Sequence, residues 1–99
     1  MKAPFQQPLK SPLVLAGDFN CPADDPALSP IRTRMVDTCS AVDVTGAREA
    51  DAVGTMVLYN IRIDHIFFDP RYLSVNDAGL LPESHRLVSD HIGYHADLF

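Results

Sequence analysis

The chain has 99 residues, a net charge of −5 and 46% hydrophobic residues, which is typical of one small globular domain. This composition excludes disordered, collagen-like and coiled-coil classes. Its eight basic residues are scattered along the chain. A nucleic-acid partner is compatible with the sequence but is not indicated by its charge, because a groove for the phosphate backbone needs clustered lysines and arginines. An acidic balance equally suits carboxylates gathered around a divalent metal.

The cysteines and the N-terminal residues bear on where the protein works. Cys21 and Cys39 are too few for a disulfide framework, and neither has a Cys or His partner at zinc-ligand spacing. Residues 1–11 contain prolines but no apolar stretch typical of a signal peptide, and no apolar run reaches the roughly 18 residues of a membrane span. We therefore expect a cytoplasmic protein without a membrane span, with a leader or loop at 1–11 and the folded part at 12–99.

The first predicted strand ends in a polar motif. Leu13–Ala16 are apolar on consecutive positions, which indicates a strand covered on both faces. The strand runs directly into G-D-F-N at residues 17–20. A loop is expected at 21–26, because this segment contains two prolines and two aspartates.

A helix is expected after this loop. Ser29 followed by Pro30 is typical of an N-cap and a first helical position. Ile31 and Met35 then follow at helical spacing. We expect the one main helix of the chain within 28–38.

The second half of the chain predicts further strands. Residues 40–58 have weak apolar signals, so we expect mostly loop with one short strand at 55–58. Residues 62–68 form the clearest strand, and its apolar residues on both faces indicate a central place in a sheet. Further strands are expected at 72–81 and 91–98. We expect the strands at 13–18, 62–68 and 91–98 to belong to one sheet, with the first two as neighbours, which brings Asp18 toward Asp64.

Three short polar motifs are placed in or beside these strands. G-D-F-N ends one strand, Asp64-His65 lies inside another and Ser89-Asp90-His91 precedes the last. Sites often form at strand ends, where a rigid scaffold meets accessible loops. A carboxylate such as Asp64 within an apolar strand needs a metal or a hydrogen-bonded partner. We expect five residues to converge at one end of the sheet: Asp18, Asn20, Asp64, Asp90 and His91.

The order of these motifs resembles a known family. G-D-F-N, R-I-D-H-I-F and S-D-H resemble the second half of the endonuclease/exonuclease/phosphatase superfamily, which includes DNase I-like nucleases, abasic-site endonucleases, inositol-phosphate phosphatases and neutral sphingomyelinases. The resemblance covers residues 12–99. It implies a C-terminal half-domain with an α/β fold, half of a four-layered α/β sandwich, containing one mostly antiparallel or mixed sheet and one main helix.

The resemblance also implies a role for each matched residue. Asp18 would orient or deprotonate the attacking water, and Asn20 would hydrogen-bond the scissile phosphate. Asp64 would hold the ring of His91 in the right tautomer, and His91 would stabilise charge on the phosphoryl oxygens. Asp90, together with Asp18, would contribute to a site for Mg²⁺ or Mn²⁺. The implied substrate is a phosphodiester or a phosphomonoester.

The chain departs from the family pattern in two places. The family's first half supplies an Asn, a metal-binding Glu and a further His or Tyr upstream of G-D-F-N, whereas the residues before Asp18 include no acidic side chain. The last motif usually has Pro two residues after the His, and here that residue is Gly93. We therefore expect weak metal binding and an activity that needs a complementing N-terminal half.

Simpler interpretations of the same residues remain open. Asp18 and Asn20 also suit a strand-ending turn in which they cap backbone amides. Asp64 also suits a buried ion pair with Arg62 or another basic residue. His65 is favoured as a hydrogen-bonded core histidine. For the whole chain, the alternative is a non-catalytic module that binds or dimerises through an uncovered sheet face, which makes a homodimer the other expected partner.

Overall fold

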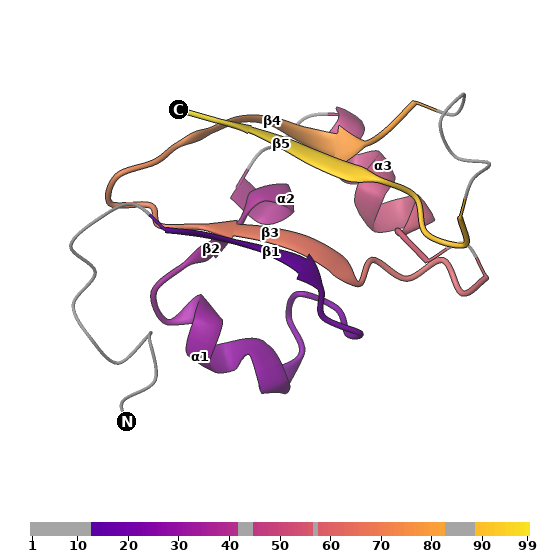
Figure 1. The fold of residues 1–99 in the computed structure, drawn as a ribbon, viewed down its shortest axis with the longest axis horizontal. Helices are drawn as coiled ribbons and strands as arrows, with labels where there is room; N and C mark the ends of the chain where they lie inside the picture. The colour runs from indigo at the N-terminus through magenta and orange to yellow at the C-terminus, as the bar shows by residue number, and fades with distance from the viewer. Residues whose placement is uncertain (1–12, 42–44, 57, 83–88) are drawn as a thin grey trace.

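The computed structural model describes residues 13–41, 45–56, 58–82 and 89–99, which form two small antiparallel sheets and several short helices (Figure 1). Mixed helix and strand content confirms the α/β class. The leader expected at 1–11 lies outside the described residues. None of the described helices is long and apolar enough to cross a membrane.

The first sheet has the predicted central strand. Its order is β1 (Val14–Asp18), β3 (Asp64–Phe68) and β2 (Val36–Asp37), and both pairings are antiparallel. The expectation that the strands at 13–18 and 62–68 are neighbours is confirmed, because Asp18 pairs directly with Asp64. The register therefore brings two carboxylates to the same end of the sheet.

The second sheet consists of β4 (Val75–Leu80) and β5 (Tyr94–Leu98), which pair antiparallel. Both strands were predicted, but the expectation of one sheet containing strands 13–18, 62–68 and 91–98 is wrong. Both edges of β3 are already occupied by β1 and β2, so β5 pairs with its near neighbour in sequence, β4. Figure 1 shows the β4–β5 sheet lying over the first sheet, with α1 (Ser29–Arg32) on the opposite side.

The helix expected within 28–38 is present only as the four-residue α1, which is not the main helix of the described residues. The 3-10 turn η2 (Pro26–Leu28) leads into α1, after which the chain continues as β2. The N-cap and the first-position proline are Asp25 and Pro26, not the predicted Ser29 and Pro30. The Asp25 carboxylate accepts a hydrogen bond from the backbone N–H of Ala27 at 2.8 Å. Arg34 and Met35 then donate their N–H groups to the carbonyl of Ile31, which closes the turn.

Residues 40–58 also differ from the expected loop. This segment completes α2 (Thr38–Ala41) and contains α3 (Thr45–Val53), the longest helix among the described residues. Glu49 and Ala50 have high helix propensity. The prediction of a loop relied on apolar spacing, which is weak in this segment, and therefore missed the helix. In place of the strand at 55–58, Met56 makes isolated bridges to Ile61 and His91.

Two apolar clusters lie on different sides of the first sheet. The first packs η2 and α1 against β3, with Ala23, Leu28, Ile31, Met35 and Phe67 buried. The second packs α2 and α3 against the other sheet, with Cys39, Ala50, Leu80 and Ile92 buried. The first strand was expected to be covered on both faces. In the described part of the chain this cover is incomplete, because Val14, at the sheet edge, is 46% exposed.

Candidate active site

Two carboxylates and one imidazole meet at the end of the first sheet. Nδ1 of His91 lies 2.7 Å from Oδ2 of Asp64, and Nε2 lies 3.9 Å from Oδ2 of Asp18. The side chains of His91 and Asp64 are 28% and 26% exposed, and that of Asp18 is 46% exposed. The cluster is therefore half-buried on one side and open to solvent at Asp18.

The antiparallel ladder of β1 and β3 positions both carboxylates. The pairing of Asp18 with Asp64 continues into a hydrogen bond from the N–H of Phe19 to the carbonyl of Ile63 at 2.9 Å. Oδ1 of Asp18 accepts the N–H of Asn20 at 2.9 Å, and Asn20 has a φ of 60°. The strand-ending turn is thus present, and it leaves Oδ2 of Asp18 facing His91.

His91 reaches the cluster from the segment that precedes β5. Its N–H donates to Oγ of Ser89 at 3.0 Å. The next residue, Ile92, donates its N–H to the carbonyl of Thr55 at 2.7 Å and is buried. His91 is therefore held by its own bond to Ser89 and by the bond of the next residue to Thr55.

The two carboxylates favour the protonated form of His91. The hydrogen bond to Asp64 raises the pKa of the imidazole, and the charges of Asp64, Asp18 and Asp90 raise it further, although partial burial opposes them. Since a carboxylate can only accept, Nδ1 carries the proton donated to Asp64. This contact fixes the ring tautomer and directs Nε2 toward the Asp18 side.

The other two predicted site residues lie beside this cluster. Asn20 is exposed in the turn after Asp18. Asp90 is exposed and accepts a hydrogen bond from Ser89 at 3.3 Å. Three of the five predicted residues, Asp18, Asp64 and His91, are thus within direct reach of one another. Asn20 and Asp90 are exposed and lie close to Asp18 and His91 in sequence.

Comparison with known proteins identifies the family of the chain. Residues 2–91 match the sequence model of the Endonuclease/Exonuclease/phosphatase family. The chain belongs to this family. No curated protein and no solved structure gives a significant match.

The donor set of this family member has room for a metal ion. Asp18, Asp64 and His91 each offer one ligand atom, and these atoms lie within 4.8 Å of one another. Carboxylate oxygens suit hard divalent cations such as Mg²⁺, Ca²⁺ and Mn²⁺. His91 suits such an ion less well, because its Nδ1 is engaged by Asp64 and its pKa is raised. The two aspartates are therefore the ligands that fit.

A cleft of about 460 Å³ extends from the cluster between the two sheets. Its lining is polar at Asp18, Asp64 and His91 and largely apolar elsewhere, along Ala16, Ile66, Leu81, Ile92 and Tyr94. Among the described residues, the lining includes no lysine or arginine. An anion that enters this cleft would therefore meet no lysine or arginine among the described lining residues, but only the imidazoles of His65 and His91.

Gly93, where the family motif usually has Pro, has a local reason in the structure. A Cβ at this position would lie 2.4 Å from Cδ1 of Leu81. The carbonyl of Gly93 also accepts the N–H of Leu81 at 2.7 Å, so the two backbones run close together. Leu81 thus fills the space that a side chain at position 93 would need.

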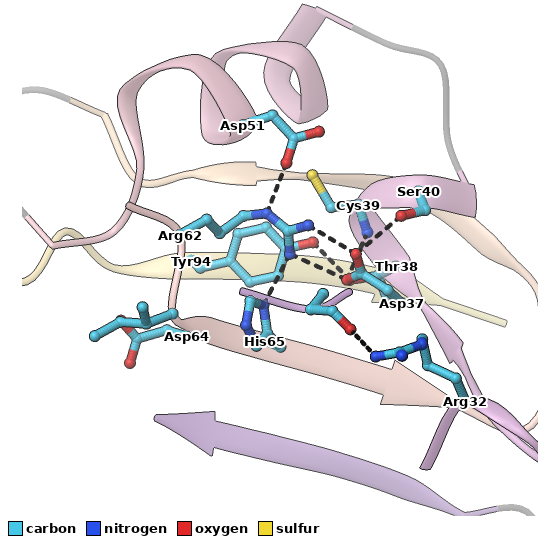
Figure 2. A network of polar contacts seen from close by, with 12 residues as sticks. Arg32, Asp37, Thr38, Cys39, Ser40, Asp51, Arg62, Asp64, His65 and Tyr94 are labelled. Carbon is cyan, nitrogen blue, oxygen red and sulfur yellow. Dashed lines mark hydrogen bonds and ion pairs between the residues drawn. The ribbon is translucent and has the colours of Figure 1, made fainter. Parts of the chain in front are cut away.

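Arg62 does not pair with Asp64, so an ion pair between these two residues is wrong. The basic side chain that contacts Asp64 is His91. Figure 2 shows its guanidinium at the centre of a polar network, from which Asp64 points away. Nη1 and Nη2 donate to the two oxygens of Asp37 at 3.2 and 2.8 Å, and Nε donates to Asp51 at 2.8 Å. Burial alone would lower the pKa of Arg62, but its bonds to Asp37 outweigh burial and raise it.

His65 is the hydrogen-bonded core histidine that the sequence favoured. Its side chain is buried, Nδ1 lies 2.9 Å from Nη1 of Arg62, and Nε2 lies 2.7 Å from the carbonyl of Cys21. Because Arg62 can only donate, Nδ1 accepts and Nε2–H donates to the carbonyl. Burial lowers the pKa of His65, which agrees with a neutral ring. The ring also packs against Phe19 and Phe67.

The sequence interpretation missed two buried residues near the site, Asp37 and Thr55. Asp37 is 6% exposed and binds Arg62, which is 25 residues away in sequence. Thr55 is 0% exposed and contacts the backbone of Asp64. The sequence offered a signal only for Asp37, which is an acidic residue directly after the apolar Met35 and Val36. Thr55 carries no recognisable motif.

Proposed function

We propose that this chain is the C-terminal half of a divalent-metal-dependent phosphoesterase, which hydrolyses a phosphodiester or a phosphomonoester. The observation that carries the proposal is the 2.7 Å contact between Asp64 and His91, in a cluster that also includes Asp18. This contact favours a positive charge on His91 beside the open carboxylate of Asp18. Such a charge stabilises the phosphoryl oxygens in the transition state of phosphoester hydrolysis.

Each residue has a defined task in this reaction. Asp18 orients a water molecule and accepts its proton as the water oxygen forms a bond to phosphorus and the ester P–O bond breaks. Asn20 donates a hydrogen bond to the scissile phosphate. Asp64 holds His91 through Nδ1, and His91 stabilises charge on the phosphoryl oxygens.

The proposed metal is Mg²⁺ or Mn²⁺, held by Asp18 and Asp64 with Asp90 as a further carboxylate. When bound, such an ion neutralises phosphate charge and activates water. The need for a cation is supported by the cleft lining, which has no lysine or arginine among the described residues. Two or three carboxylates are few for a Mg²⁺ site, so we propose that a complementing N-terminal half supplies further ligands.

Metal binding by the isolated chain is expected to be weak. Mg²⁺ dehydrates reluctantly, and two or three carboxylates without a substrate phosphate should give a dissociation constant no tighter than about 1 mM. Isothermal titration calorimetry with MgCl₂ measures this constant, and the double variant Asp18→Asn with Asp64→Asn provides the baseline. A micromolar constant for the wild-type chain would contradict the expectation.

Metal-dependent hydrolysis tests the proposed activity. The chain is assayed on bis(p-nitrophenyl) phosphate and on p-nitrophenyl phosphate with MgCl₂, with MnCl₂ and with EDTA. With a supplied N-terminal half, we expect release of p-nitrophenol that requires the metal and that His91→Ala lowers by at least about 100-fold. Activity that is unaffected by His91→Ala, or absent even with a supplied N-terminal half, would exclude the proposal.

An uncovered strand edge supports the second candidate function, a non-catalytic dimerising module. In the described part of the chain β1 is the edge of its sheet, with Val14 46% exposed. Two copies that pair through this edge would form a closed two-fold dimer. Sedimentation equilibrium at micromolar concentration distinguishes a dimer from a monomer. A monomeric chain with metal-dependent hydrolysis would exclude this candidate.

A further inference from the structure

We infer that Thr55 is a positioning residue, which fixes Asp64 against His91 without touching the substrate. The inference rests on the proposed function for its catalytic consequence, but its structural claim concerns the Asp64–His91 contact itself. Thr55 lies between the two segments that carry this pair, and it is 0% exposed.

The hydroxyl of Thr55 fixes the beginning of β3. Oγ1 accepts the backbone N–H of Ile63 at 3.0 Å and that of Asp64 at 3.1 Å. A hydroxyl oxygen has two acceptor lone pairs, so these two bonds use both. Because water does not reach this position, loss of the hydroxyl would leave buried N–H groups without an acceptor.

The backbone of Thr55 fixes the segment that carries His91. Its carbonyl accepts the N–H of Ile92 at 2.7 Å, one residue after His91. Its N–H donates to the carbonyl of Ile61 at 3.1 Å, three residues before Asp64. Thr55 therefore connects the backbone of Asp64 with the segment that carries His91.

Gly54 makes this placement possible. It has a φ of 84°, and a Cβ there would lie 2.5 Å from the carbonyl carbon of Asn60 and from the backbone nitrogen of Ile61. The chain at 60–61 thus crosses directly over Gly54 as it enters β3. This close approach places Thr55 beside the start of β3, where its hydroxyl reaches the N–H groups of Ile63 and Asp64.

The test compares matched threonine substitutions. Thr55→Val keeps the side-chain volume and loses the hydroxyl, whereas Thr55→Ser keeps the hydroxyl. Thr38→Val is the control, because Thr38 is also 0% exposed and loses a hydrogen bond, in this case of 2.6 Å to Tyr94. The first readout is the far-downfield Nδ1–H signal of His91 in NMR spectra of the metal-free protein.

We expect the His91 ring signal in the wild type, in Thr55→Ser and in Thr38→Val, and its loss in Thr55→Val. In the phosphodiester assay, kcat of Thr55→Val is expected to fall by about 10- to 100-fold with KM changed by less than about threefold, since a displaced catalytic pair impairs the chemical step. An unchanged ring signal in folded Thr55→Val, or equal loss in Thr38→Val, would overturn the inference.

Two further outcomes keep the test decisive. If Thr55→Val does not fold, Thr55→Ser still decides, because loss of the ring signal in a folded protein that keeps the hydroxyl would contradict the proposed role. If the wild type has no phosphoesterase activity, the proposed function fails, while the ring-signal comparison still decides whether Thr55 positions the pair.

Discussion

Replacement of Arg62 by alanine is expected to lower the free energy of unfolding by about 3–5 kcal/mol. The side chains of Arg62 and Asp37 are only 10% and 5% exposed, and the guanidinium fork donates to both oxygens of Asp37. Without Arg62, the Asp37 carboxylate stays buried without its cation. Since a small domain is stable by about 5–15 kcal/mol, this one change would remove a large part of the total.

Urea denaturation of the wild type and of two alanine variants measures this effect. Asp51→Ala is the matched control, because Asp51 binds the same guanidinium at 2.8 Å but its side chain is 61% exposed. Its loss should cost less than about 1 kcal/mol, as for other exposed ion pairs. Similar losses for Arg62→Ala and Asp51→Ala would show that burial of Asp37 does not determine the stability of this network.

The strands could be predicted because their signals are local. Apolar residues at 13–16 and 62–68, each followed by a turn or a proline, identify β1 and β3 without any tertiary information. The two strands were also predicted to be neighbours, which brings Asp18 toward Asp64, and the observed register pairs these two residues directly. The Asp64–His91 contact was likewise predicted from the order of the motifs, and it is present at 2.7 Å.

The helices and the sheet arrangement could not be predicted in the same way. Helices as short as α1, with four residues, lack the length over which periodicity becomes informative. The division into two sheets depends on which edges of β3 are occupied, and the two-residue strand β2 takes one of them. No pattern in residues 36–37 indicates this role.

The supports of the site were the least predictable part. Arg62 and Asp37 are distant in sequence, and so are His65 and Cys21, whose carbonyl His65 links to Arg62. The hydroxyl of Thr55 matters because of a crossing at Gly54 that is set by backbone geometry. Residues that would take part in the chemistry can thus be recognised from motifs, whereas the residues that hold them in place can be identified only from the folded structure.

Replacement of Asp64 by asparagine is expected to lower the proposed hydrolysis by about 100- to 10,000-fold. An asparagine can donate its NH₂ group to Nδ1 of His91, which would place the ring proton on Nε2, the wrong tautomer. The hydrogen bond to Asp64 is also the main cause of the raised pKa of His91. The variant should therefore lower this pKa toward the ordinary value of about 6.5. NMR titration of the His91 ring in metal-free protein measures the change, with Asp90→Asn as the control that removes only a nearby charge.

The same pKa gives the sign of a stability effect. A histidine whose pKa is raised by folding stabilises the folded state fully at pH values below the unfolded pKa of about 6.5, and this contribution is lost as the pH rises through the folded pKa. The stability difference between the wild type and Asp64→Asn should therefore be larger at acidic pH than above the pKa of His91. Urea denaturation at both pH values provides the measurement. A difference that grows as the pH rises, together with an unchanged pKa of His91, would show that the imidazole gains no charge stabilisation from Asp64, and the role proposed for this pair would have to be abandoned.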